Sequence, residues 1–246
     1  MTGPSGAPLV PAATAVVLRD GPDGIEVLMG RRNRQLRFAA GLWVFPGGRV
    51  DDDDWSDGVP PVRDLDMGEG YATPGLLDAG RNAAVREAQE ETRLALDPDT
   101  LVPLSLWTPP PEYAQRFGTL FFLAPAPDES GDLVPDGGEI LELRWLTAEA
   151  VLRLRAAGEG ELLPPTYITL HTLLRFSTVG EALEAVADRQ PPRYATRLSL
   201  VEGGMVARYE EDVAYDSADL ESPGPRHRLW MLDSGWRYER TDDEAA

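Results

Sequence analysis

The chain has 246 residues, 42% of them hydrophobic, and a formal net charge of −19 at pH 7. This acidity argues against a nucleic-acid polymer as a partner, because such binding depends on a basic surface. The absence of cysteine excludes disulfides, thiol catalysis and cysteine metal sites. With no signal-peptide pattern and no apolar stretch near about 18 residues, we expect a cytoplasmic protein without a membrane partner.

The first half of the chain predicts a β-rich unit with one helix. Apolar runs typical of strands end at turns that contain glycine or proline, and they lie at residues 12–18, 25–29, 42–45, 101–106 and 118–124. A helix is predicted from Asn82 to Leu94. Residues 49–77 are rich in Asp, Gly and Pro and predict a loop, in which Asp51–Asp54 form a solvated acidic turn.

The second half predicts three helices and a β-rich tail. A glycine turn at 137–138 leads into a strand at 140–145. Thr147 can cap a helix that reaches Ala156, and Thr178 can cap another that reaches Ala187, with a helix at 165–176 between them. Hairpin strands follow at 194–201, 205–209, 229–232 and 236–238.

The run Arg86-Glu87-Ala88-Gln89-Glu90-Glu91 places three carboxylates on one face of the predicted helix. At about 100° per residue, Glu87, Glu90 and Glu91 share one narrow arc. Neighbouring like charges repel unless a cation neutralises them, and Mg²⁺ or Mn²⁺ favours carboxylate oxygen. The pattern therefore indicates a divalent-cation site, with a solvated acidic face as the alternative.

This run, together with Phe45-Pro46-Gly47-Gly48, resembles the sequence box of the Nudix hydrolases. That box reads Gly, five residues, Glu, seven residues, then Arg-Glu-apolar-x-Glu-Glu-x-Gly-apolar. Gly48 matches its opening glycine. Counting back from Arg86 reaches Asp78 where the family has Glu, with an insertion at residues 49–77; without an insertion the acid would be Asp54. Arg93 replaces the final glycine and puts the usual turn at the helix end in doubt.

The resemblance implies an α/β (α+β) Nudix fold, in which a mixed β-sheet lies between helices. The expected domain covers residues 10–176, and residues 177–246 form an extension of a helix and β-hairpins. The implied metal ligands for Mg²⁺ or Mn²⁺ are Gly48, Glu87, Glu90 and Glu91. Arg86 would orient these carboxylates, and the catalytic base would be Glu90 or Glu139, with Glu142 as a second candidate. Glu139 is otherwise an ordinary acid at a strand edge.

A narrower resemblance concerns the residues before Gly47. Leu28, Arg32, Leu36, Arg37 and Gly41 match the motif of Nudix enzymes that hydrolyse coenzyme A. Arginines bind phosphate through forked hydrogen bonds, so this patch indicates a phosphorylated ligand, with a solvated basic loop as the alternative. The predicted substrate-binding residues are Arg31, Arg32, Arg37 and Arg116.

We therefore expect hydrolysis of the diphosphate in a small nucleotide derivative, most specifically coenzyme A or acyl-CoA. The products would be adenosine 3′,5′-bisphosphate and (acyl-)4′-phosphopantetheine. The alternatives are ADP-ribose, a dinucleotide or a nucleoside triphosphate as substrate, or a non-catalytic nucleotide-binding regulatory module. The oligomeric state stays open, with a homodimer as one option. His171 and His227 are expected to be structural or surface residues.

Overall fold

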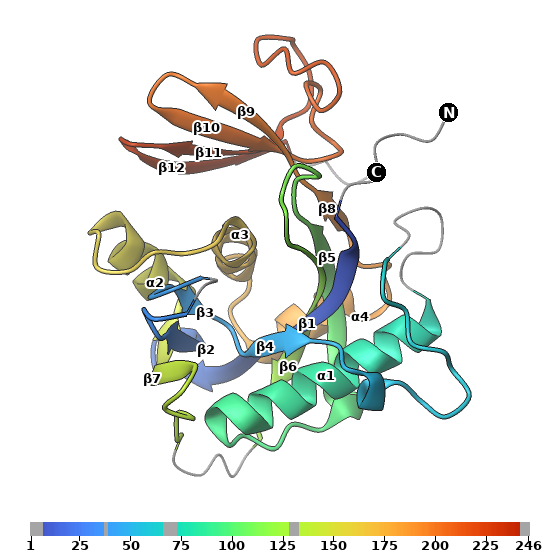
Figure 1. Ribbon diagram of the computed structural model, residues 1–246. Coiled ribbons are helices and arrows are strands. Elements are labelled where there is room, and N and C mark those ends of the chain that lie inside the picture. The colour runs from blue at the N-terminus through green and yellow to red at the C-terminus, as the bar shows by residue number, and fades with distance from the viewer. Residues whose placement is uncertain (1–6, 37–38, 66–72, 128–132, 242–246) are drawn as a thin grey trace.

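The computed structural model describes residues 7–36, 39–65, 73–127 and 133–241 (Figure 1). The larger sheet contains β1 (Leu9–Gly21), β2 (Gly24–Arg32), β3 (Trp43–Val44), β4 (Gly47–Arg49), β5 (Val102–Thr108), β6 (Arg116–Pro125), β7 (Ile140–Thr147) and β8 (Arg193–Ala195). The smaller sheet contains β9 (Arg197–Val201), β10 (Gly204–Arg208), β11 (His227–Leu232) and β12 (Gly235–Arg240). The helices are α1 (Pro74–Thr92), α2 (Ala148–Ala156), α3 (Pro164–Leu173) and α4 (Val179–Ala187), with 3₁₀ turns η1 (Asp52–Asp54) and η2 (Pro98–Thr100).

The larger sheet is buried on both faces. Its order is β3-β2-β1-β6-β5-β8, with β4 paired to β1 and β7 paired to β2; β1 and β6 run parallel. Because successive side chains of a strand point to opposite faces, Val16 and Leu18 of β1 join the core with α2, α3 and α4, whereas Ala15 and Val17 join the core with α1. This layered arrangement confirms the predicted α+β fold with a mixed sheet between helices.

Helix α1 begins at Pro74, about two turns before the predicted start at Asn82. The Thr73 side chain accepts a hydrogen bond from the Leu76 N–H at 3.3 Å, and Pro74 occupies the first turn, where its missing N–H costs nothing. The predicted loop was therefore wrong for residues 74–77, which belong to α1. The sequence signal was the Thr-Pro pair, which is typical of a helix start.

Helix α1 ends in a left-handed turn despite its arginine. Arg93 has φ 67°, and its N–H donates a hydrogen bond to the Gln89 carbonyl at 3.1 Å. The turn that the missing glycine put in doubt does form. A residue with a Cβ is strained in this conformation, so Arg93 lowers the stability of the folded state locally.

Arg93→Gly should stabilise the protein by about 1 kcal/mol, because glycine adopts a positive φ without steric strain. Urea unfolding would measure the change. Arg93→Ala is the control, since it removes the guanidinium and keeps the Cβ. A glycine variant no more stable than the alanine variant would show that the turn is unstrained.

The remaining helices begin where the sequence predicts. Thr147 and Thr178 accept hydrogen bonds from the N–H groups of Ala150 and Glu181, both at 3.2 Å. Helix α3 ends at Leu173, before the predicted residue 176. None of the helices in the described part of the chain is both long and apolar enough to cross a membrane.

The C-terminal segment packs against the larger sheet before it forms its own. Helix α4 contributes to the same core as α2 and α3, and β8 pairs in parallel with β5. The smaller sheet has the order β12-β11-β10-β9 and lies at the end of the molecule away from α1 (Figure 1). These contacts join the expected extension 177–246 to the rest of the fold.

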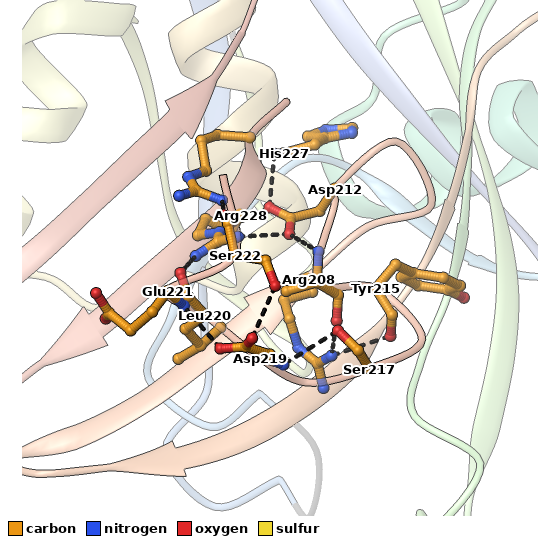
Figure 2. A network of polar contacts seen from close by, with 12 residues as sticks. Arg208, Asp212, Tyr215, Ser217, Asp219, Leu220, Glu221, Ser222, His227 and Arg228 are labelled. Atoms are coloured by element: carbon orange, nitrogen blue, oxygen red, sulfur yellow. Dashed lines mark hydrogen bonds and ion pairs between the residues drawn. The ribbon is translucent and has the colours of Figure 1, made fainter. Parts of the chain in front are cut away.

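A buried ion pair holds the long connection between β10 and β11 (Figure 2). Arg228, 1% exposed, donates to both oxygens of Asp212 at 2.6 Å. The same carboxylate accepts from the N–H groups of His227 and Ala214, each at 2.8 Å. Arg208 donates to the Tyr215 carbonyl at 2.9 Å. Because the charges are paired and hydrogen-bonded, their burial is tolerated.

Candidate active site

The glycine pair after β3 brings backbone against α1. A Cβ on Gly48 would lie 2.3 Å from Oε1 of Glu87, and one on Gly47 would lie 2.4 Å from the Ala13 carbonyl oxygen. The Gly47 N–H donates a hydrogen bond to Oε2 of Glu91 at 3.1 Å. Gly47 therefore needs to be glycine because a Cβ would clash with backbone, whereas a Cβ at Gly48 would displace the Glu87 carboxylate from this position.

Arg86 is fixed from the opposite side by Asp54. Its Nε and Nη2 donate to the two Asp54 oxygens at 3.1 and 2.9 Å, and Nη2 also donates to the Arg49 carbonyl at 3.0 Å. Its remaining nitrogen, Nη1, donates to Oε1 of Glu87 at 2.9 Å. The hydrogen bond to Asp54 is the main cause that raises the pKa of the Arg86 guanidinium. Arg86 thus joins Asp54 to Glu87.

Asp54, rather than Asp78, is the aspartate that pairs with Arg86. Asp54 is 5% exposed and follows Gly48 at the uninterrupted spacing, and Asn82 donates to its backbone carbonyl at 2.9 Å. Asp78 is exposed and pairs with Arg81 at 2.9 Å, on the same helix. The prediction that Asp54 lies in a solvated turn was therefore wrong.

The three glutamates of α1 differ sharply in burial. The Glu91 side chain is 6% exposed, that of Glu87 is 17% exposed and that of Glu90 is 59% exposed. Burial raises the pKa of Glu91 to about 8 and also raises that of Glu87, against the lowering effect of Arg86 on Glu87. Glu90 lies 3.5 Å from Nη1 of Arg86. Buried carboxylates with raised pKa values are frequent at functional sites, because a bound cation can stabilise the ionised form.

In the metal-free protein, stability should fall as pH rises between about 5 and 8. The folded state holds the Glu91 proton up to a pKa of about 8, whereas an exposed carboxyl releases it near 4.5. The folded state therefore binds more protons than the unfolded state between these two pH values. The contribution of Glu91 to stability is complete below about pH 4.5 and is lost as the pH rises to about 8. We expect Tm in EDTA to drop by several degrees.

Glu91→Gln should flatten this dependence of Tm on pH, because the amide does not titrate. Glu90→Gln is the matched control, since Glu90 is exposed and should leave the slope intact. An unchanged slope in Glu91→Gln would assign the effect to another group.

Glu139 lies beside the same carboxylates through Arg32. Nη2 of Arg32 donates to Oε2 of Glu139 at 2.9 Å, while Nη1 lies 3.8 Å from Oε1 of Glu91. The Asn33 N–H donates to the Glu139 carbonyl at 2.7 Å and ties the two loops together. The structure thus places the second base candidate, which sequence spacing alone left uncertain, next to α1.

Arg31 and Arg116 do not gather at this site. Arg31 pairs with Glu142 of β7 at 3.7 Å and continues the alternation of Val27 and Met29, which face the core on the side opposite α1. Arg116 donates to the Ala7 carbonyl at 3.1 Å. Arg37 lies outside the described residues. Among the predicted arginines that the structure describes, Arg32 is the one that contacts the glutamates of α1.

The donors at the site suit a hard divalent cation. The Gly48 carbonyl and the carboxylates of Glu87, Glu90 and Glu91 offer only oxygen, which Mg²⁺ and Mn²⁺ prefer. Among the residues that the structure describes, no three acidic or histidine side chains are already gathered as a coordination shell. In this conformation Arg86 and Arg32 are the cations that the carboxylates contact. The donor types therefore fit a metal ion, with Arg86 and Arg32 beside the carboxylates that would hold it.

Comparison with known proteins agrees with this geometry. The family model described as NUDIX domain matches residues 74–164, a range that begins at the first residue of α1. No curated protein matches the chain. A NUDIX hydrolase structure from Alicyclobacillus acidocaldarius has 24% sequence identity and a TM-score of 0.60, with 76% of this chain and 100% of that chain covered. A MutT NUDIX hydrolase structure from Burkholderia pseudomallei has 21% identity and a TM-score of 0.45, with 66% and 95% covered. Residues 74–164 match the NUDIX domain model, and the chain has the fold of the NUDIX hydrolase from Alicyclobacillus acidocaldarius.

Proposed function

We propose that the protein is a metal-dependent pyrophosphohydrolase that cleaves the diphosphate linkage of a nucleotide derivative. One observation carries this proposal: the carboxylates of α1 face the Gly47-Gly48 backbone, with Arg86 fixed between Asp54 and Glu87. Carboxylate oxygens beside glycine backbone suit a cation and the phosphates that it accompanies. A solvated acidic face, the alternative, would not bury Glu91 or pin Arg86.

The residues of the site differ in exposure, and we assign their roles accordingly. Bound Mg²⁺ or Mn²⁺ would neutralise phosphate charge and lower the pKa of a water molecule. Glu90 is the most exposed of the three glutamates and is placed to accept the proton of that water. Glu139, whose carboxylate accepts a hydrogen bond from Arg32, is the second candidate base. Arg86 holds Glu87 in position.

For the substrate we propose coenzyme A or acyl-CoA. The support is the motif around Arg32 and Arg37 before the glycine pair, together with the position of Arg32 beside Glu91 and Glu139. Hydrolysis would give adenosine 3′,5′-bisphosphate and (acyl-)4′-phosphopantetheine. We assign no phosphate contact to Arg31, because it pairs with Glu142 on the other face.

A substrate panel tests both parts of the proposal. Coenzyme A, acetyl-CoA, ADP-ribose, a dinucleoside polyphosphate and a nucleoside triphosphate would each be incubated with Mg²⁺, Mn²⁺ or EDTA, and the products identified by mass. We expect the highest kcat/KM for a coenzyme A substrate and no turnover in EDTA. A preference for ADP-ribose would overturn the proposed coenzyme A substrate but would still support the proposed hydrolase activity. Tight binding without hydrolysis would favour a non-catalytic module.

A further inference from the structure

Four arginines line a pocket of about 370 Å³ between the helices and the smaller sheet. This arginine pocket is lined by Arg175, Arg189, Glu211, Pro225, Arg226, Arg240 and Thr241. Arg175 follows α3, Arg189 follows α4, Arg226 precedes β11 and Arg240 ends β12. Such a concentration of one charge is unexpected in a chain with 42 acidic and 23 basic residues. It indicates a local function for positive charge.

Backbone and side-chain contacts hold two of these arginines on one wall. Arg226 and Thr241 pair through an N–H donated to Thr241 Oγ1 at 2.8 Å and a Thr241 N–H donated to the Arg226 carbonyl at 2.7 Å. Nη1 of Arg226 donates to the Ser222 carbonyl at 2.7 Å. Nη1 of Arg240 donates to the Tyr194 hydroxyl at 3.3 Å. Contacts within the protein therefore hold Arg226 and Arg240 in place.

Arg189 adds a positive charge to the pocket that Glu211 does not pair with. Its acidic lining residue, Glu211, already contacts Nη2 of Arg240 at 2.9 Å and Nδ1 of His227 at 3.2 Å. Within the described part of the chain, the Arg189 guanidinium has no carboxylate partner. Burial lowers the pKa of Arg189, and the charges of Arg240 and Arg175 lower it further. An anion between these arginines would relieve that repulsion.

We propose that the arginine pocket binds the phosphate groups of a small phosphorylated molecule, at a site separate from the carboxylates of α1. Guanidinium groups bind phosphate through paired, charge-assisted hydrogen bonds. The volume lies at the lower end of the range for ligand pockets, which suits a mono- or diphosphate. Helices α3 and α4 cover the face of the larger sheet opposite α1, so one ligand does not span both sites (Figure 1).

Calorimetric titration of the full chain with pyrophosphate in EDTA tests this site without the metal-dependent one. We expect binding that Arg189→Gln weakens by about tenfold or more, because one charged hydrogen-bond donor is lost. Arg226→Gln serves as a second variant should the first unfold, as judged by circular dichroism. Arg153→Gln, which removes an exposed arginine of α2, is the matched control and should bind like the wild type. No binding by the wild type, or equal binding by all variants, would overturn the proposal.

Two further variants establish where the pyrophosphate binds and whether the chain itself competes with it. Arg32→Gln should bind pyrophosphate unchanged, since the arginine pocket does not include Arg32; a loss there would place the binding beside the carboxylates of α1 instead. Asp242, Asp243 and Glu244 follow Thr241 in the sequence and offer competing anions. Neutralising all three as Asn, Asn and Gln should leave the affinity within about twofold. If this triple variant bound pyrophosphate and the wild type did not, the acidic residues of the chain itself would be the ligand of the pocket, and the proposed ligand would be rejected.

Discussion

Glutamine in place of Glu90 should lower metal-dependent hydrolysis by about 10²- to 10⁴-fold, the usual contribution of a positioned base. The amide cannot accept the water's proton and carries no charge to hold a cation. Because the Glu90 side chain is 59% exposed, its replacement should leave the fold and Tm nearly unchanged. The measurement is kcat with Mg²⁺ or Mn²⁺ at saturating substrate, together with thermal unfolding of the same sample.

Glu184→Gln is the matched control, because this exposed glutamate lies on α4, across the sheet from α1. It should retain wild-type kcat. Should Glu90→Gln turn over fully while folded, Glu90 would have no catalytic role, and Glu139→Gln would become the decisive variant. A loss in both Glu90→Gln and Glu139→Gln would assign both groups to the reaction.

Asp54→Asn should destabilise the protein by about 3 to 5 kcal/mol, the range for breaking a buried ion pair on one side. Asparagine keeps one acceptor oxygen but loses the charge, so Arg86 no longer has a bidentate carboxylate partner. Arg86 also positions Glu87, so kcat should fall as well. Urea unfolding and metal-dependent turnover measure the two effects.

Two companion variants make this test specific. Asp78→Asn should change stability by less than about 0.5 kcal/mol, because Asp78 forms an exposed pair with Arg81. Asp54→Glu keeps the charge and the family's residue type, and should retain most activity. If Asp78→Asn caused the larger loss, the insertion would precede the acid of the box, and Asp78 would be that acid.

Local patterns were sufficient to predict most elements. Alternating apolar residues predicted β1, β2 and β6, and Thr147 and Thr178 marked helix starts that the structure confirms. The start of α1 was missed because the Thr73-Pro74 signal lies inside a segment whose composition favours a loop. Composition averages over many residues, whereas a helix cap depends on one.

The acidic partner of Arg86 could not be obtained by counting residues. Asp54 and Arg86 meet across 32 positions of sequence, and an ion pair depends on the fold rather than on spacing. Counting back from Arg86 selected Asp78, whose helix face turns it toward Arg81. Counting forward from Gly48 reaches Asp54 and agrees with the structure.

The sequence by itself determined the carboxylate face of α1 and the glycine pair beside it, because helical periodicity and the absence of a side chain are local properties. Tertiary structure decided which acid holds Arg86, which glutamate is buried, and that Arg32 and Arg31 serve opposite faces of the sheet. Those outcomes depend on contacts between distant segments and on desolvation at their interface, and neither is encoded in the spacing of residues along the chain.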